Sequence, residues 1–141
     1  MNSLIPLAIV LVLASAFGFW FNASRGRIKS AKQAKGSVVK PALSPTELGV
    51  PFGSRVTLLQ FSSAFCSPCR ATRALIADIT ADMTDVVHVD MDAESHLDLV
   101  NRLNIISTPT TIILNSAGVE VGRAIGAPKR TQVVSAIASV V

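Results

Sequence analysis

The chain has 141 residues, which is enough for one small domain and an appendage. Residues 22–44 hold six of the 13 lysines and arginines and no acidic residue, whereas residues 45–141 hold seven basic and nine acidic residues. The net charge of +4 therefore belongs to the connecting stretch, and the composition gives no indication of a nucleic-acid-binding domain. The two cysteines are too few for a disulfide scaffold, and they supply only half the ligands of a structural zinc site.

The N-terminal segment Leu4–Phe21 has no charged residue and is almost wholly apolar. As a helix it would be about 27 Å long at roughly 1.5 Å per residue, close to the ~30 Å hydrocarbon thickness of a bilayer. We therefore predict a transmembrane helix over residues 1–22. A cleaved signal peptide, with Ala14-Ser15-Ala16 as its cleavage site, is an alternative, although Met1–Ser3 lacks the expected basic residue. A buried core helix is a third interpretation.

Residues 23–44 alternate bases with small and polar residues and show no apolar period, so we predict a basic flexible linker there. Basic residues beside a membrane span stay on the cytoplasmic side. We therefore predict a single-pass protein of the cell membrane whose domain, residues 45–141, lies in the cytoplasm. An extracytoplasmic domain is the alternative.

Within residues 45–141 the hydrophobic pattern alternates between strands and helices. Strands are predicted at Val56–Phe61, Val86–Met91, Thr110–Leu114 and Val119–Ile125, and helices at Ser67–Met83, Ser95–Leu103 and from Pro128 onward. The buried side of the first helix is expected to carry Leu75, Ile79 and Met83, and that of the last helix Val133, Val134, Ile137 and Val141. This order predicts an α/β domain with a four-stranded mixed sheet and helices on both faces.

Cys66-Ser67-Pro68-Cys69 lies where a predicted buried strand gives way to a helix. The first N–H groups of a helix lack intrahelical partners, and the helix dipole favours a thiolate at that end. A thiolate is the form of cysteine that attacks a disulfide, and Cys69 lies close enough to resolve the mixed disulfide that follows. Arg70 would add positive charge if its side chain folded back. The other interpretations of an isolated C-x-x-C are half of a metal site or two incidental thiols.

These residues resemble the thioredoxin superfamily. Phe61–Arg70 is similar to the family's strand, loop and C-x-P-C motif, Thr108-Pro109-Thr110 to its cis-proline loop, and Gly126 to a glycine beside that loop. The resemblance covers residues 55–141. It implies a thioredoxin-like fold, a cis peptide bond before Pro109, and substrate binding by Thr108, Pro109 and Gly126.

The sequence departs from the family pattern at several positions. Gln60 stands where thioredoxins have a buried acid, and Gln cannot take the proton of the second cysteine. Ser62 and Phe65 replace tryptophans, and Phe65 is expected to cover the sulfurs with its ring. Ser67 replaces the usual glycine of the motif. Pro68 and Arg70, which match the family motif, and Phe65 and Ser67, which depart from it, are all expected to support the motif.

The resemblance implies an enzyme, a thiol–disulfide oxidoreductase with protein disulfides or dithiols as substrates, and the N-terminal segment predicts that it is tethered to a membrane. The resemblance also implies a reductase partner such as thioredoxin reductase, and no cofactor. A redox-responsive or non-catalytic thioredoxin-fold binding module at the membrane is the main alternative, and a glutaredoxin-like or cluster-binding protein is another. His88, Asp90, Asp92 and His96 can be drawn as a metal cluster, but the polar side of a strand explains them better, and no metal is expected.

Overall fold

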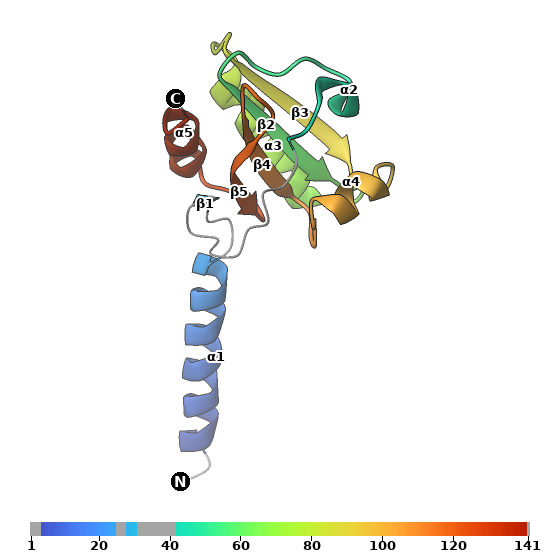
Figure 1. Cartoon of the computed structure of the whole chain (residues 1–141). Helices are drawn as coiled ribbons and strands as arrows, with labels where there is room; N and C mark the ends of the chain where they lie inside the picture. The colour runs from blue at the N-terminus through green and yellow to red at the C-terminus, as the bar shows by residue number, and fades with distance from the viewer. Residues whose placement is uncertain (1–3, 25–27, 31–41, 141) are drawn as a thin grey trace.

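The computed structural model describes residues 4–24, 28–30 and 42–140 (Figure 1). The helices of this part are α1 (Leu4–Ser24), α2 (Pro45–Leu48), α3 (Ser67–Thr80), α4 (Leu97–Arg102) and α5 (Arg130–Ala138). The strands are β1 (Ile28–Ser30), β2 (Val56–Ser62), β3 (Val86–Asp92), β4 (Thr110–Asn115) and β5 (Glu120–Ile125). From β2 onward the order β-α-β-α-β-β-α is the predicted one.

The strands form one mixed sheet in the order β1-β5-β4-β2-β3. Strands β2 and β3 are parallel, and the other neighbours pair antiparallel. The predicted four-stranded sheet is therefore confirmed, with β1 added at one edge. Strand β1 lies within the stretch that was expected to be a flexible linker. It is defined by its pairing with β5, and its three residues are too few to show an alternating pattern in the sequence.

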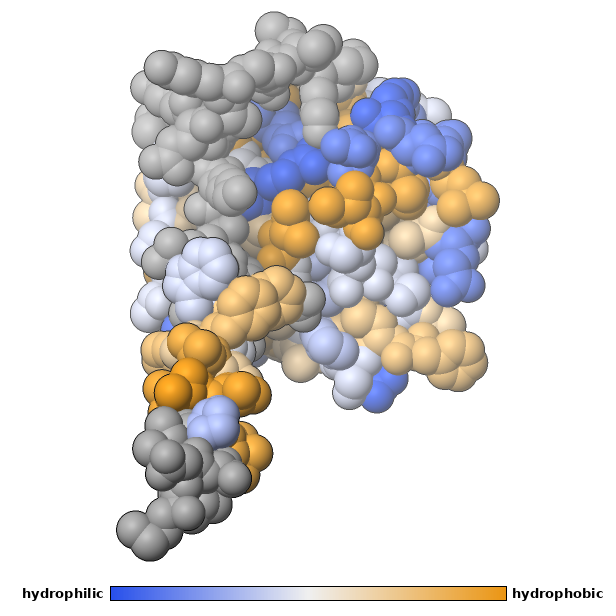
Figure 2. Space-filling model, turned by 90° about the horizontal axis from the view of Figure 1, so that it is seen from below, coloured by the Kyte–Doolittle hydropathy of each residue, from blue (hydrophilic) through white to orange (hydrophobic). Residues whose placement is uncertain are grey.

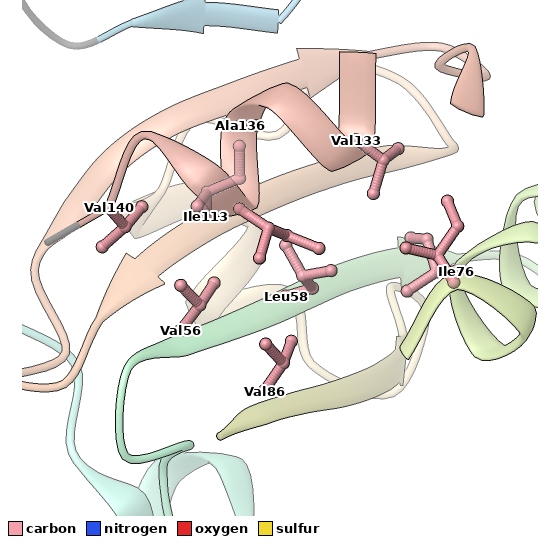
Figure 3. Packing of buried hydrophobic residues seen from close by; sticks show 10 residues of the cluster. Val56, Leu58, Ile76, Val86, Ile113, Val133, Ala136 and Val140 are labelled. Carbon is pink, nitrogen blue, oxygen red and sulfur yellow. The ribbon is translucent and has the colours of Figure 1, made fainter. Parts of the chain in front are cut away.

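The sheet is the middle of three layers. All seven residues of β2 are buried, and they alternate between the two faces. On one face Val56 and Leu58 belong to a cluster with residues of α3 and α5, shown in Figure 3. On the other face Leu59 and Phe61 pack with residues of α2 and α4. Because α3 is held on the same face as Leu58, the even-numbered residues of β2 point toward the helix that carries the cysteines.

Helix α1 projects away from this domain (Figure 1). Its large hydrophobic side chains between residues 7 and 21 keep 48% to 80% of their area exposed, and Figure 2 shows hydrophobic surface along it. The predicted helix is thus present. The predicted membrane span is not found, because no helix in the described residues is both long enough and apolar enough to cross a membrane.

The helix faces differ from the sequence prediction in detail. Helix α3 ends at Thr80, so Met83 lies beyond it and only packs against the edge of the core. In α5 the buried residues are Val133, Ala136, Ile137 and, just past the helix, Val140. Val134 was expected to be buried but keeps 42% of its area, because the helical period turns it outward, and Val141 lies outside the described residues.

The neighbouring valines of α5 give a matched test of this packing. Val133→Ala removes two methyl groups from a side chain that is 3% exposed, and we expect it to lower the free energy of unfolding by about 2 kcal/mol. The same substitution at Val134 should change it by less than about 0.5 kcal/mol, since the solvated valine loses little contact. Urea unfolding of both variants measures this difference, and equal losses would contradict the assigned face.

Candidate functional site

The two cysteines lie at the junction between β2 and α3. Cys66 is the N-cap of α3, and its Sγ accepts the backbone N–H of Cys69 at 3.1 Å. The unpartnered N–H groups of a helix start therefore point at this sulfur, as predicted. The two residues form a disulfide with their Cα atoms 5.2 Å apart. Cys66 is half-buried while Cys69 keeps only 1% of its area, so an incoming sulfur reaches Cys66 first.

The residues around the cysteines face outward. Ser67 and Pro68 are exposed in the first turn of α3, where the missing N–H of Pro68 breaks no helical hydrogen bond. Arg70 donates to Ser67 Oγ at 3.3 Å and is exposed. The expectation that Phe65 covers the sulfurs is wrong, because its ring keeps 99% of its area and is turned into solvent.

The proline loop lies beside the cysteine loop. The Thr108–Pro109 bond is cis, as predicted. A hydrogen bond of 3.1 Å joins Thr108 Oγ1 to Ser63 Oγ in the loop before Cys66. The backbone N–H of Gly126 donates to the carbonyl oxygen of Pro109 at 2.8 Å, and its φ of 85° is one that glycine adopts without penalty. The structure thus brings together the three segments singled out in the sequence.

A polar cluster lies beneath the start of α3. The buried Gln60 donates from Nε2 to the carbonyl oxygen of Cys69 at 3.0 Å and to Ser62 Oγ at 2.9 Å. Ser62 Oγ donates to Asp90 Oδ1 at 2.5 Å. His88 Nε2 lies 3.3 Å from Gln60 Oε1, and since an amide oxygen can only accept, the proton of this contact is on His88.

Asp90 joins this cluster to an open cleft. Its second oxygen, Oδ2, accepts a hydrogen bond from Arg73 in an ion pair. Asp90, Arg73, Ser62 and Cys69 all line one cleft of about 390 Å³. The sequence could not place Asp90 against Gln60, because the register between β2 and β3 depends on loop lengths that carry no pattern. The only sign of Asp90 in the sequence was the alternation of polar residues along the predicted strand.

The structure does not bring the candidate metal ligands His88, Asp90, Asp92 and His96 together as a metal site. Within the part of the chain that the structure describes, no three His, Cys, Asp or Glu side chains are placed to hold a metal ion. Asp92 accepts from Ser95 Oγ at 2.5 Å and from the N–H of Glu94 at 3.1 Å, and these bonds lower the pKa of its carboxyl. His96 Nδ1 is 2.9 Å from the Asp92 carbonyl oxygen. The polar side of the strand and a loop cap account for these residues.

The buried position of His88 predicts a pH dependence of stability. Burial lowers the pKa of His88 below 6.5, the charge of Arg73 lowers it further, and that of Asp90 partly opposes both. As the pH falls through 6.5 the unfolded chain takes up this proton before the folded chain does, so the free energy of unfolding should decrease. His88→Gln should remove this part of the slope in urea unfolding measured against pH. His96→Gln, which keeps His88, is the control, and loss of the slope there instead would contradict the assignment.

The chain matches a known family over most of its length. The family model for thioredoxin matches residues 50–139. Rice Thioredoxin H5 is 31% identical over 62 residues, which are 44% of this chain and 46% of the rice protein. Thioredoxin of Mycoplasma genitalium is 30% identical over 77 residues, which are 55% of this chain and 74% of that protein. The chain thus spans about half the length of the rice relative.

The folds agree as well. The crystal structure of thioredoxin NaTrxh from Nicotiana alata matches with a TM-score of 0.55 and 27% sequence identity, over 60% of this chain and 72% of that one. The matched family region includes the cysteine pair, the cis-proline loop and Gly126. The chain therefore belongs to the thioredoxin family.

Proposed function

We propose that the chain is a thiol–disulfide oxidoreductase that exchanges its dithiol with disulfides of protein substrates. The observation that carries the proposal is the placement of Cys66 at the start of α3, with a helix N–H on its sulfur and a buried Cys69 one turn along. The thiolate of Cys66 attacks a substrate disulfide and forms a mixed disulfide, and one substrate sulfur leaves as a thiolate. Cys69 then attacks Cys66 Sγ, which closes the Cys66–Cys69 bond and releases the second substrate thiol.

The proline loop is the proposed docking site for the substrate. Its hydrogen bond to Ser63 holds Thr108 beside the motif, so that the backbone of Thr108 can pair with an extended substrate segment. Pro109 is buried, and Gly126 fixes its carbonyl group. Reduction of the Cys66–Cys69 disulfide after each turnover requires a reductase of the thioredoxin reductase kind as partner, with no cofactor bound to this chain.

A second function, a redox-responsive binding module without turnover, is favoured by one observation. Gln60 is fully buried beside Cys69 and cannot accept a proton. If no other group took over that role, the mixed disulfide would persist and the protein would hold its partner rather than reduce it.

Cysteine variants distinguish these two functions. The full chain with dithiothreitol should accelerate the reduction of insulin disulfides, and Cys66→Ser should abolish the acceleration because no attacking thiolate remains. Cys69→Ser should also stop turnover but accumulate a mixed disulfide between Cys66 and the substrate, visible on a non-reducing gel.

Ser67→Ala is the matched control for these variants, since it changes a neighbouring exposed side chain and keeps both sulfurs. A wild-type chain that forms the mixed disulfide but never releases it would favour the binding module. A Cys69→Ser variant that turns over as fast as the wild type would contradict the roles given to both cysteines.

No described helix meets the length and apolarity of a membrane span, but we propose that the N-terminal helix attaches the chain to the cell membrane. The apolar side chains of α1 are exposed on every side, which stabilises a helix in lipid and destabilises it in water. The run Leu4–Phe21 has no charge, and the six bases of residues 22–44 follow it. By the positive-inside rule the domain would lie in the cytoplasm, with an extracytoplasmic domain as the alternative.

Membrane fractionation tests this attachment. The full chain should stay with membranes through a carbonate wash, and Val10→Arg combined with Leu13→Arg should move it to the supernatant, because each arginine at a helix centre opposes insertion by about 3 kcal/mol. Val10→Leu with Leu13→Val keeps the apolar surface and is the control. A wild-type chain that washes off would contradict attachment, and high activity of a C-terminal alkaline phosphatase fusion would contradict the cytoplasmic orientation.

A further inference from the structure

Thioredoxins have an acid where this chain has Gln60, and here an acidic residue, Asp90, lies next to that position on the neighbouring strand. In the parallel pair of β2 and β3, Gln60 is the register partner of Asp90. Both residues lie toward the carboxyl ends of their strands, on the face that α3 covers, and Ser62 Oγ joins them by hydrogen bonds of 2.9 Å and 2.5 Å. A carboxylate is therefore present beside the second cysteine, although β2 does not supply it.

The hydrogen bonds of this cluster all run in one direction. His88 donates to Gln60, Gln60 donates to Ser62, and Ser62 donates to Asp90. The chain of donors ends at Asp90, which also accepts from Arg73. Because each carboxylate oxygen has two acceptor positions, the carboxylate of Asp90 keeps capacity for a further proton. Gln60 and Ser62 are not bases at neutral pH, and His88, whose Nδ1 can accept a proton, does not line the cleft.

Asp90 and Cys69 share one solvent-open space. Both line the cleft of about 390 Å³ beside the motif. The side chain of Asp90 keeps 22% of its area exposed, whereas Cys69 is buried except for its approach to this cleft. A base that is not in direct contact with a thiol can take its proton through one water molecule. A cleft of this size admits that water.

Other charged groups surround Asp90. From α3, Arg70 and Arg73 line the cleft, and Arg73 pairs with Asp90. From β3, His88 faces the same polar cluster, and Asp92 lines the cleft with its oxygens engaged by the Ser95 loop. Strand β2 contributes only uncharged partners. Asp90 is thus the carboxylate that both lines the cleft and belongs to the cluster under Cys69.

We propose that Asp90 accepts the proton that Cys69 loses when it resolves the mixed disulfide, and so replaces the missing acid of β2. This inference rests on the proposed oxidoreductase function. In the step, the Cys69 thiol gives its proton to the Asp90 carboxylate through solvent in the cleft. The Cys69 thiolate attacks Cys66 Sγ, the Cys66–Cys69 bond forms, and the bond from Cys66 to the substrate breaks. The substrate sulfur leaves with the electron pair and is reduced, while the protein dithiol is oxidised.

A chromogenic aromatic disulfide separates the two steps in one experiment. Reduced full-length protein should release one coloured thiolate when Cys66 attacks and a second when Cys69 resolves. Asp90→Asn should leave the first phase within about threefold of the wild type and slow the second at least tenfold at neutral pH, as expected for loss of a general base. The second phase of this variant should recover as the pH is raised, because hydroxide then removes the proton.

Asp78→Asn is the matched control, since it also removes a carboxylate from an arginine pair, here with Arg130, and lies outside the cleft. It should leave both phases unchanged. Gln60→Glu in the Asp90→Asn background returns an acid to β2 and should restore the second phase, which a purely structural defect would not allow. Unfolding midpoints of all variants identify any that fail to fold.

The outcomes are distinguishable. A wild-type protein that shows neither phase overturns the oxidoreductase function itself. A wild type with two phases and an Asp90→Asn variant with the same two phases overturns only the role of Asp90. Equal slowing of both phases, with no change in the pH dependence and no rescue by Gln60→Glu, also overturns it and leaves Asp90 as a structural partner of Arg73.

Discussion

The contact on which the site depends is the hydrogen bond from the Cys69 N–H to Cys66 Sγ. It exists because β2 leads through a short loop into α3, and the residue at the N-cap position of that helix is Cys66 itself. A serine or aspartate N-cap would satisfy the same donor, but neither would carry redox chemistry. Here the reactive atom is itself the cap. The fold therefore stabilises negative charge on Cys66 by the same interaction that begins the helix.

The packing beneath α3 explains how a polar cluster is tolerated inside the domain. Toward their starts, β2 and β3 bury Val56, Leu58 and Val86 against α3 and α5, as Figure 3 shows. Toward their ends the same face carries Gln60 and Asp90 instead. Gln60, Ser62 and Asp90 each have a hydrogen-bond partner, and the network opens to solvent at the cleft. Buried polar atoms that are satisfied in this way destabilise the fold little, and they keep a proton-carrying group near Cys69.

The sequence predicted the positions of the helices and strands better than the contacts between them. From β2 onward the strands and the cysteine motif were found from local patterns, because each depends on neighbours in the chain, and the cis-proline loop was found from the resemblance to the thioredoxin family. The edge strand β1, the outward turn of Val134 and the exposure of Phe65 were not, because they depend on which surfaces meet after folding. The position of Asp90 also depends on which surfaces meet after folding. Its polar alternation was visible, but its register against Gln60 is a property of two strands 30 residues apart along the chain.

The difference in exposure between the two sulfurs links the site to its function. The half-buried Cys66 lies next to the exposed Phe65, where a substrate disulfide could reach it, whereas the buried Cys69 lines the cleft beside β3. In the proposed mechanism, attack on the substrate would take place at the half-buried Cys66, and proton removal from the buried Cys69 would take place at the cleft. The attack by Cys69 is what releases the substrate in this mechanism, so the proton acceptor has to reach Cys69 while the mixed disulfide is still in place.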